Sequence, residues 1–284
     1  MRLVILSLLS GLTLSCSQSA PEPIVDISLD PIWRISGFEN PESALFVAET
    51  GFLYVSNVAG EGGAVDGNGY ISRLTLDGEI DTLRWATSGL SAPKGLAYAN
   101  GQIFVTDITD IVAIDLDTGE IGMRFPAPGA GFLNDAIAGE DGRIYASDSA
   151  TQRIYVLEDN GVSVWAEDDL LSAANGMWLE NDRMLLITMN DRLVAIDRSS
   201  RDISVLAEGV GDGDGIAPDG YGGYLANEWP GQTYRITPTG EVTVLDDARA
   251  DEAYTNDFTI VGDIVYTPHF NSGEVSASRI LPVD

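Results

Sequence analysis

The sequence predicts an all-β fold, a six-bladed β-propeller, from three features of the chain. Six times a polar residue opens a short apolar run, and these runs recur about every forty residues. Short β-rich segments and glycine turns such as Asp77-Gly78 and Thr239-Gly240 lie between the runs. The composition, with 31 glycines and 44% hydrophobic residues, suits a globular β-protein without long apolar helical stripes. Four short strands in each repeat correspond to one propeller blade.

One polar position keeps the same phase in every repeat. Each of these residues opens the first strand of its unit, and the first strands of a propeller line its central channel. The six residues are Glu42, Lys94, Asn134, Asn175, Asp214 and Asn256. Their side chains are therefore expected to converge on the propeller axis.

The two ends of the chain predict how the ring closes. The last unit has no fourth strand of its own, and residues 31–37 parallel residues 82–89, the fourth strand that precedes the second unit. We therefore expect residues 28–37 to complete the sixth blade and to pair a sheet edge that would otherwise be open. A glycine-rich insertion at 58–69 in the first unit is placed to cover the mouth of the channel.

The charge balance excludes one class of partner. The chain carries 44 acidic and 15 basic residues, a formal net charge of −29. Nucleic-acid binding is excluded, because phosphate recognition needs a basic surface. The excess of carboxylates indicates a solvated surface, and its field attracts cations without proving a metal site. We expect a monomer with a single propeller domain at 28–284.

The N-terminal segment has the pattern of an export signal. Arg2 precedes the apolar stretch 3–15, which is too short to span a bilayer stably. Residues 12–16, Leu-Thr-Leu-Ser-Cys, resemble a bacterial lipobox with Cys16 as the lipidated residue. The alternatives are cleavage after Ala20, which would give a secreted protein without a lipid, and retention of the apolar segment as an uncleaved anchor. We expect a signal peptide at 1–15, a tether at 16–27, and a lipid that holds the protein to a membrane of the bacterial cell envelope.

Four of the axial residues carry the oxygen ligands of a hard cation. Ca²⁺ binds six to eight oxygens and accepts both carboxylates and Asn carbonyls. Glu42, Asn134, Asn175 and Asp214 supply two carboxylates and two amides, whose formal charge balances one divalent ion. Zinc more typically recruits His or Cys, and the chain has one of each, neither in these positions. The alternative is structural, because Asn-Gly and Asp-Gly are common turn formers.

The order of these four residues is similar to that of a known family. The local sequences are Asn40-Pro-Glu42-Ser, Leu133-Asn134-Asp135, Ala174-Asn175-Gly176-Met177 and Gly213-Asp214-Gly215. With one ligand each from units one, three, four and five, the chain resembles the SMP-30/gluconolactonase/luciferin-regenerating-enzyme family, whose plan the diisopropylfluorophosphatase and paraoxonase types share. The resemblance covers most of residues 31–284.

The resemblance implies a calcium-dependent hydrolase of lactones or related esters, with another divalent cation as the alternative to Ca²⁺. Glu42 would anchor the ion, and Asn134 and Asn175 would fix it and orient the oxygen of a small-molecule substrate. Asp214 would act as general base or nucleophile. His269, the only histidine, follows the second strand of the sixth unit and is the candidate proton carrier.

Lys94 and Asn256 occupy the two remaining axial positions and are expected in the substrate pocket. For the Lys94 ammonium three roles stay open: contact with a substrate oxygen, an ion pair with Glu42, or occupation of the place of the metal. The ends of the second strands are expected to form the pocket rim, with Asn57, Asp107, Asp148, Met189, Asn227 and Glu228.

A second functional hypothesis is a non-enzymatic, lipid-anchored propeller that recruits a protein or ligand through its rim. Propellers carry many unrelated functions, so the fold alone does not separate the two hypotheses. The sequence has no Gly-x-Ser-x-Gly elbow, His-Glu-x-x-His helix or phosphate-binding loop, so other hydrolytic or nucleotide chemistry lacks support.

Overall fold

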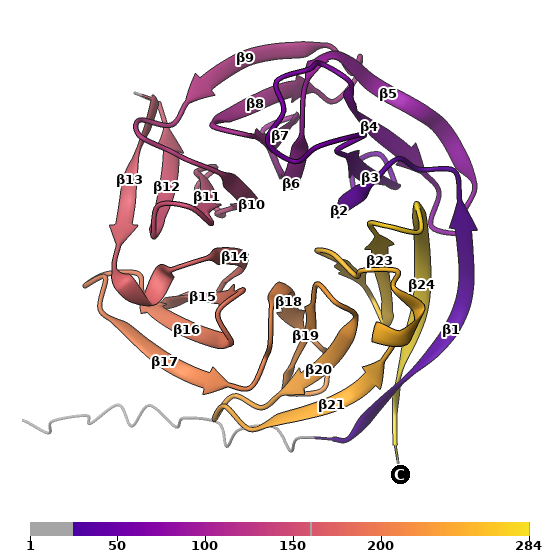
Figure 1. Cartoon of the computed structure of the whole chain (residues 1–284), viewed down its shortest axis with the longest axis vertical. Helices are drawn as coiled ribbons and strands as arrows, with labels where there is room; N and C mark the ends of the chain where they lie inside the picture. Colours follow the sequence, from indigo (N-terminus) through magenta and orange to yellow (C-terminus); the bar gives the residue numbers. More distant parts are fainter. Residues whose placement is uncertain (1–24, 160, 284) are drawn as a thin grey trace, which may run out of the picture.

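Six four-stranded sheets stand in a ring around a central axis in the computed structural model, which describes residues 25–159 and 161–283 (Figure 1). The predicted all-β, six-bladed propeller is confirmed. The predicted signal peptide, Cys16 and most of the tether lie outside the described residues, so lipidation and envelope localisation stay predictions. In the described part of the chain, no helix is long and apolar enough to cross a membrane.

In the first five blades, the strands follow chain order from the axis outward. Blade one contains β2 (Pro41–Val47), β3 (Phe52–Asn57), β4 (Gly69–Leu74) and β5 (Ile80–Leu90). Blade two contains β6 (Pro93–Ala99), β7 (Gln102–Asp107), β8 (Asp110–Asp115) and β9 (Ile121–Pro126). Blade three contains β10 (Leu133–Ala138), β11 (Ile144–Asp148), β12 (Arg153–Glu158) and β13 (Gly161–Glu167). Blade four contains β14 (Ala174–Leu179), β15 (Arg183–Thr188), β16 (Arg192–Asp197) and β17 (Ile203–Glu208). Blade five contains β18 (Gly213–Pro218), β19 (Tyr224–Glu228), β20 (Gln232–Ile236) and β21 (Val242–Asp247).

The sixth blade is built from both ends of the chain. Its order is β22 (Thr259–Val261), β23 (Ile264–His269), β24 (Glu274–Pro282) and β1 (Ile27–Ser36). β1 pairs antiparallel with β24 along nearly its whole length, from Ile27 opposite Pro282 to Ser36 opposite Glu274. The predicted closure by the N-terminal strand is confirmed, and the edge of β24 is thereby hydrogen-bonded.

Aromatic pairs join the outermost strand of three blades to the second strand of the same blade. The tryptophan on the outer strand packs against a buried tyrosine, with ring centroids 5.8, 4.7 and 5.3 Å apart. The pairs are Trp33–Tyr266 in blade six, Trp85–Tyr54 in blade one and Trp165–Tyr145 in blade three. Such pairs stabilise by roughly 0.5–1.5 kcal/mol beyond the area they bury. They fix the outer strand of each blade over its core.

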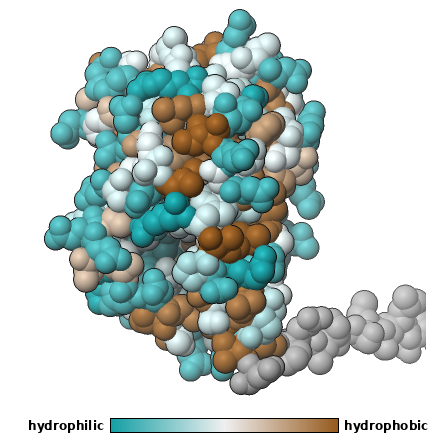
Figure 2. Space-filling view, turned by 90° about the vertical axis from the view of Figure 1, so that its right-hand side faces the viewer, coloured by the Kyte–Doolittle hydropathy of each residue, from teal (hydrophilic) through white to brown (hydrophobic). Residues whose placement is uncertain are grey.

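Hydrophobic side chains fill the space between neighbouring blades. Val47 and Tyr54 of blade one, for example, pack with Leu96 and Ile103 of blade two. The outer strand of blade three is mostly exposed or partly buried, whereas the inner strands of blades one and two are buried along most of their length. The surface in Figure 2 is correspondingly mixed, with hydrophobic residues in small patches among hydrophilic ones. The packing holds the six inner strands rigidly around the axis.

Candidate functional site at the propeller axis

All six axial residues line one cavity. Its volume is about 170 Å³, and it opens at the end of the channel where the inner strands begin. The lining residues are Glu42, Val58, Gly62, Lys94, Phe132, Asn134, Asn175, Met189, Asp214, Trp229, Asn256 and Phe270. The convergence expected from the repeat phase is therefore present in the structure. Val58 and Gly62 belong to the 58–69 insertion, which covers part of the mouth.

A local irregularity of the first strand pair aims each axial side chain. In blades one to five, the pairing of the inner strand with its neighbour shifts register across the axial residue and the residue after it. In blade three, Leu133 pairs with Asp148 and the next pair is Ala136 with Ala146. An extra residue of this kind bends the strand and redirects side chains. The recurring shift explains why the phase of the polar residue is the same in each repeat.

The residue after the axial one approaches the next blade closely. A Cβ on Gly95 would lie 2.3 Å from the amide nitrogen of Ala136, and a Cβ on Gly176 would lie 2.1 Å from the carbonyl oxygen of Asp214. Only glycine fits such a contact. The Asn175-Gly176 and Asp214-Gly215 dipeptides are thus strand residues at a blade contact, and the turn interpretation of these dipeptides is wrong.

Polar side chains at the ends of the second strands satisfy the backbone of the shifted positions. Ser56 Oγ accepts a hydrogen bond from the N–H of Ser43 at 3.0 Å, and Ser147 Oγ accepts one from the N–H of Asp135 at 3.0 Å. In blade five, Asn227 Oδ1 accepts the N–H of Gly215 at 2.7 Å. A buried N–H without a partner would be costly, so these residues are part of the site's framework. The recurring small polar residue at the end of each second strand is the signal in the sequence that could have identified them.

Four oxygens of the axial residues are buried without any hydrogen-bond partner. They are Glu42 Oε2, Asn134 Oδ1, Asp214 Oδ1 and Asn256 Oδ1, called the axial oxygens below. A buried oxygen without a donor costs about 1–3 kcal/mol, and more when it is charged. Because these four atoms only accept, the cavity they line favours a cation or a hydrogen-bond donor.

Hydrogen bonds at the other atoms of these side chains orient the free oxygens. Asn175 Nδ2 donates to Asp214 Oδ2 at 3.2 Å, and Asn134 Nδ2 donates to Ser149 Oγ at 3.1 Å. Ser149 in turn donates to the carbonyl of Ala174 at 2.6 Å. The amide nitrogen of Asn134 is thus held outside the pocket, and its oxygen is left facing the axis.

The charges in the site are held in an unfavourable environment. Burial raises the pKa of Glu42 well above the usual carboxyl range, and the neighbouring Asp214 raises it further, although Lys94 opposes this. Burial likewise raises the pKa of Asp214, with the carboxylate of Asp257 adding to the effect. Two carboxylates that share a dry site repel one another, and a bound cation would relieve that repulsion.

Lys94 donates its hydrogen bonds to backbone carbonyls rather than to Glu42. Its ammonium donates to the carbonyls of Gly62 at 2.9 Å and Ala92 at 3.1 Å, and it lies 4.2 Å from the ring centroid of Phe132. Burial lowers the pKa of Lys94. Among the described residues, no ion pair joins Lys94 to Glu42, although the two charges interact at longer range. Lys94 lines the pocket as expected, but two of its three N–H bonds tie down backbone.

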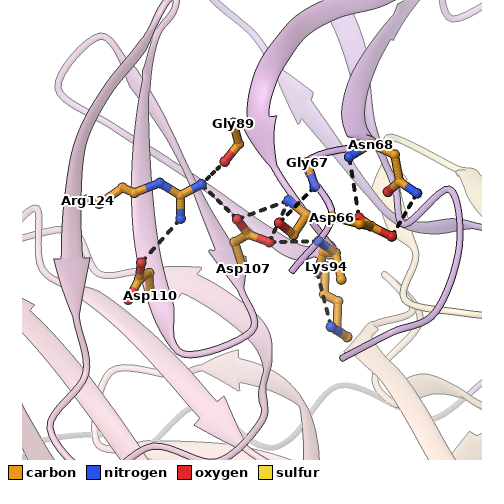
Figure 3. A network of polar contacts seen from close by, with 10 residues as sticks. Asp66, Gly67, Asn68, Gly89, Lys94, Asp107, Asp110 and Arg124 are labelled. Atoms are coloured by element: carbon orange, nitrogen blue, oxygen red, sulfur yellow. Dashed lines mark hydrogen bonds and ion pairs between the residues drawn. The ribbon is translucent and has the colours of Figure 1, made fainter. Parts of the chain in front are cut away.

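The segment that carries Lys94 is itself anchored from blade two. Asp107, at the end of β7, accepts the N–H of Ala92 at 2.8 Å and of Ser91 at 3.1 Å, and it pairs with Arg124 at 2.9 Å (Figure 3). In blade three, Asp148 takes the equivalent role, since it accepts the N–H of Gly131 at 2.8 Å.

These anchoring carboxylates do not form the rim that was expected of them. Of the six expected rim residues, only Met189 lines the axial pocket. Four of the others accept hydrogen bonds from backbone N–H groups, namely Asn57, Asp107, Asp148 and Asn227, whereas Glu228 lies 3.8 Å from Arg249. Because side chains alternate along the second strands, the end position of β7 or β11 points into the preceding loop rather than into the channel.

His269 lies outside the axial pocket. It ends β23, and its Nε2 is 2.8 Å from Ser276 Oγ on β24. Its ring lines a cavity of about 360 Å³ between blades five and six, together with Thr233 and Thr267. Burial lowers the pKa of His269 to about 3, so the imidazole is neutral. The alternation of β23 turns His269 to this face, and its position does not support the predicted proton transfer at the axis.

The donor set fits a hard divalent cation. In the described part of the chain, no three His, Cys, Asp or Glu side chains gather as a metal-binding group. The axial set instead combines the carboxylates of Glu42 and Asp214 with amide oxygens, and Ca²⁺ accepts this mixture. The set is suited to a cation because its four axial oxygens have no hydrogen-bond partner. Asn256 joins the predicted four, because its oxygen also faces the cavity.

Comparisons with known proteins bear on the fold. No family model matches the sequence, and no curated protein is similar to it. Among solved structures, a gluconolactonase from Xanthomonas campestris superposes with a TM-score of 0.70 at 14% identity, over 94% of this chain and 99% of that chain. The chain is gluconolactonase-like in fold. The resemblance inferred from the axial residues is confirmed at this level.

Two further solved structures of similar fold carry the names of different activities. A luciferin-regenerating enzyme has a TM-score of 0.68 at 14% identity, over 91% of this chain and 96% of that chain. Virginiamycin B lyase from Staphylococcus aureus has a TM-score of 0.65 at 15% identity, over 90% of this chain and 100% of that chain. Since a lyase stands beside a lactonase, the activity of this chain has to be argued from its own axial residues.

Proposed function

We propose that this protein is a calcium-dependent hydrolase of lactones or related esters, with its active site at the propeller axis. The observation that carries the proposal is the set of four unpartnered, buried axial oxygens in one small cavity. Glu42, Asn134 and Asp214 would hold the ion together with Asn175, and Asn256 would add a further oxygen. Another divalent cation of similar chemistry is the alternative to Ca²⁺.

The ion and Asp214 have different proposed roles in hydrolysis. When bound, a divalent cation would supply polarisation of the carbonyl or phosphoryl oxygen of a substrate, a contribution worth several kcal/mol. Asp214 is the proposed general base, because Asn175 holds one of its oxygens and leaves Oδ1 free toward the cavity. In that role Oδ1 would accept a proton from water as the water oxygen bonds to the carbonyl carbon and the carbonyl π electrons move to the carbonyl oxygen. Collapse of this adduct would break the acyl carbon–oxygen bond, and the proton held by Asp214 would pass to the departing alkoxide. Positive charge nearby favours the ionised form of Asp214 that this step needs.

Metal-dependent melting and hydrolysis test the proposal together. The protein is stripped with EDTA, titrated with Ca²⁺ while its thermal melting is followed, and assayed against a panel of lactones and phosphotriesters. A free ion at 100 times its dissociation constant adds about 2.7 kcal/mol of stability, which should raise the Tm by several degrees. Hydrolysis should appear only after Ca²⁺ is restored.

Matched variants separate the axial site from nonspecific effects of the acidic surface. Asp214→Asn should abolish both the Ca²⁺-dependent Tm shift and hydrolysis. Asp212→Asn, two residues away and exposed, should retain both. Equal hydrolysis with and without Ca²⁺ would refute metal dependence. Loss of the Ca²⁺-dependent Tm shift in both variants would indicate that the ion does not bind at the axis.

A further inference from the structure

We infer that the substrate of this site carries a compact apolar group, aromatic or alkyl, and few or no free hydroxyls. The inference rests on the proposed function and narrows its substrate class. It comes from the composition of the cavity above the axial oxygens. That part is formed by Val58, Phe132, Met189, Trp229 and Phe270, called the apolar wall below.

The apolar wall surrounds the space that a substrate's non-reacting part must enter. Three of its five side chains are aromatic, and Trp229 is braced by Tyr254 at 4.5 Å and by Phe270 at 6.4 Å between ring centroids. None of the five side chains carries an oxygen, and the only strong hydrogen-bonding group among them is the indole N–H of Trp229. Aromatic walls of this kind bind flat or branched hydrocarbon surfaces.

Most polar groups of the pocket are already engaged or lie at its reacting end. The axial oxygens lie at the reacting end, where the ion and the carbonyl are proposed to meet. The Lys94 ammonium donates to the carbonyls of Gly62 and Ala92 and lies on the face of Phe132. A sugar lactone would therefore place several hydroxyls against the apolar wall without partners, and each such hydroxyl weakens binding roughly tenfold or more.

The size of the cavity sets the size of the group. Its volume is about 170 Å³. An apolar cavity of about 150 Å³ is known to hold one benzene molecule. The pocket thus accommodates one ring or a short branched chain, while a longer chain would have to leave through the mouth beside the 58–69 loop.

Two lactones of nearly equal size and opposite polarity test this inference. The full-length, Ca²⁺-loaded protein is assayed with dihydrocoumarin and with glucono-δ-lactone, each rate taken relative to its uncatalysed hydrolysis. We expect kcat/KM for dihydrocoumarin to be at least about tenfold higher. Equal or faster hydrolysis of glucono-δ-lactone, dependent on Ca²⁺, would overturn the inference and leave the proposed function standing.

Substitutions at Met189 test the apolar wall with the same two lactones, so that the different intrinsic reactivities of the lactones do not affect the comparison. Met189 is only partly buried at the pocket, so its replacement should not prevent folding. Met189→Gln has nearly the same shape but puts an amide into the apolar wall, and it should narrow the ratio between the two lactones by about three- to tenfold. Met189→Leu keeps the wall apolar and should keep the preference. The same ratio in both variants and the parent would contradict a role for the wall.

Binding separates a wrong substrate class from a wrong function. If neither these lactones nor any member of the lactone and phosphotriester panel is hydrolysed with any divalent ion, the proposed function fails, and titration calorimetry with two non-hydrolysable lactams decides the inference. Tighter binding of 3,4-dihydroquinolin-2-one than of gluconolactam would support the apolar class. Equal binding of the two, binding of neither, or tighter binding of gluconolactam would overturn it.

Discussion

Ser43 on the first inner strand donates a 2.7 Å hydrogen bond to the carboxylate of Asp257, in the segment that leads into the last inner strand. The two residues are 214 positions apart in the chain, and a parallel bridge joins their backbones. The contact belongs to a ring of contacts one residue beyond the axial position, in which each blade touches the next. Ser43 and Asp257 close that ring between blade one and blade six.

Removal of this contact should lower the free energy of unfolding. Ser43→Ala leaves a buried carboxylate with one donor fewer, and hydrogen bonds to charged groups contribute about 1.5–3 kcal/mol. Urea denaturation measures the loss. Ser199→Ala is the control, because Ser199 makes the same kind of bond to Asp197 at 2.6 Å in an exposed turn and should cost less than about 0.5 kcal/mol. Equal losses would argue against a closing role for the Ser43 bond.

Gly176→Ala should damage both the blade contact and the ion site. Its Cβ would lie 2.1 Å from the carbonyl oxygen of Asp214, so the backbone that carries Asp214 must shift. We expect a loss of about 2–3 kcal/mol in unfolding free energy and a weaker Ca²⁺-dependent Tm shift. Gly63→Ala has open space around its Cβ and should change neither quantity. An unchanged Tm shift in Gly176→Ala would show that Asp214 tolerates the displacement.

Lys94→Met should strengthen Ca²⁺ binding and loosen the covering loop. The ammonium interacts electrostatically with Glu42, and its removal lowers the positive potential at the axis. A gain on the order of 1 kcal/mol, about fivefold in affinity, is expected from loss of a like charge in this buried site. Loss of the bond to Gly62 should speed cleavage after the exposed Glu61 by a Glu-specific protease. Lys94→Arg keeps the charge and should not gain affinity, whereas weaker binding in Lys94→Met would show that Lys94 supports the ion.

His269 should make stability depend on pH without affecting catalysis. Its pKa is about 3 in the folded protein against an ordinary value of 6.5, because burial disfavours the charged form. The unfolded state therefore binds the proton more readily, so the stabilisation is complete above about pH 6.5 and is lost as the pH falls toward 3.

Comparison of His269→Gln with the parent isolates this effect. The stability of the parent relative to the variant should fall by on the order of 3 kcal/mol between about pH 7 and about pH 4, since glutamine does not titrate. Parallel curves of stability against pH would show that the imidazole is solvated. A loss of kcat beyond about tenfold in His269→Gln would restore it as a candidate for proton transfer.

The repeat could be recognised in the sequence because every blade is built from the same pattern of polar and apolar residues. The phase of Glu42, Asn134, Asn175 and Asp214 identified the residues that meet at the axis, and the missing last strand identified the N-terminal segment that replaces it. The placement of Asp107 and His269 was not accessible in this way. Whether the end of a second strand faces the channel, a loop or the next blade depends on the register of its partner strand.

The sequence by itself determined the propeller, its closure and the six residues at its axis. Apolar residues alternate every two positions within a strand, and the whole pattern repeats about every forty residues from blade to blade, so both periods can be recognised from the order of apolar residues alone. Only the tertiary structure decided what surrounds those residues. Lys94 turned to the loop carbonyls of Gly62 and Ala92, and Phe132, Trp229 and Phe270 came from separate blades to form the wall. Such contacts join residues far apart in the chain, and their geometry follows from how the blades pack rather than from any local pattern.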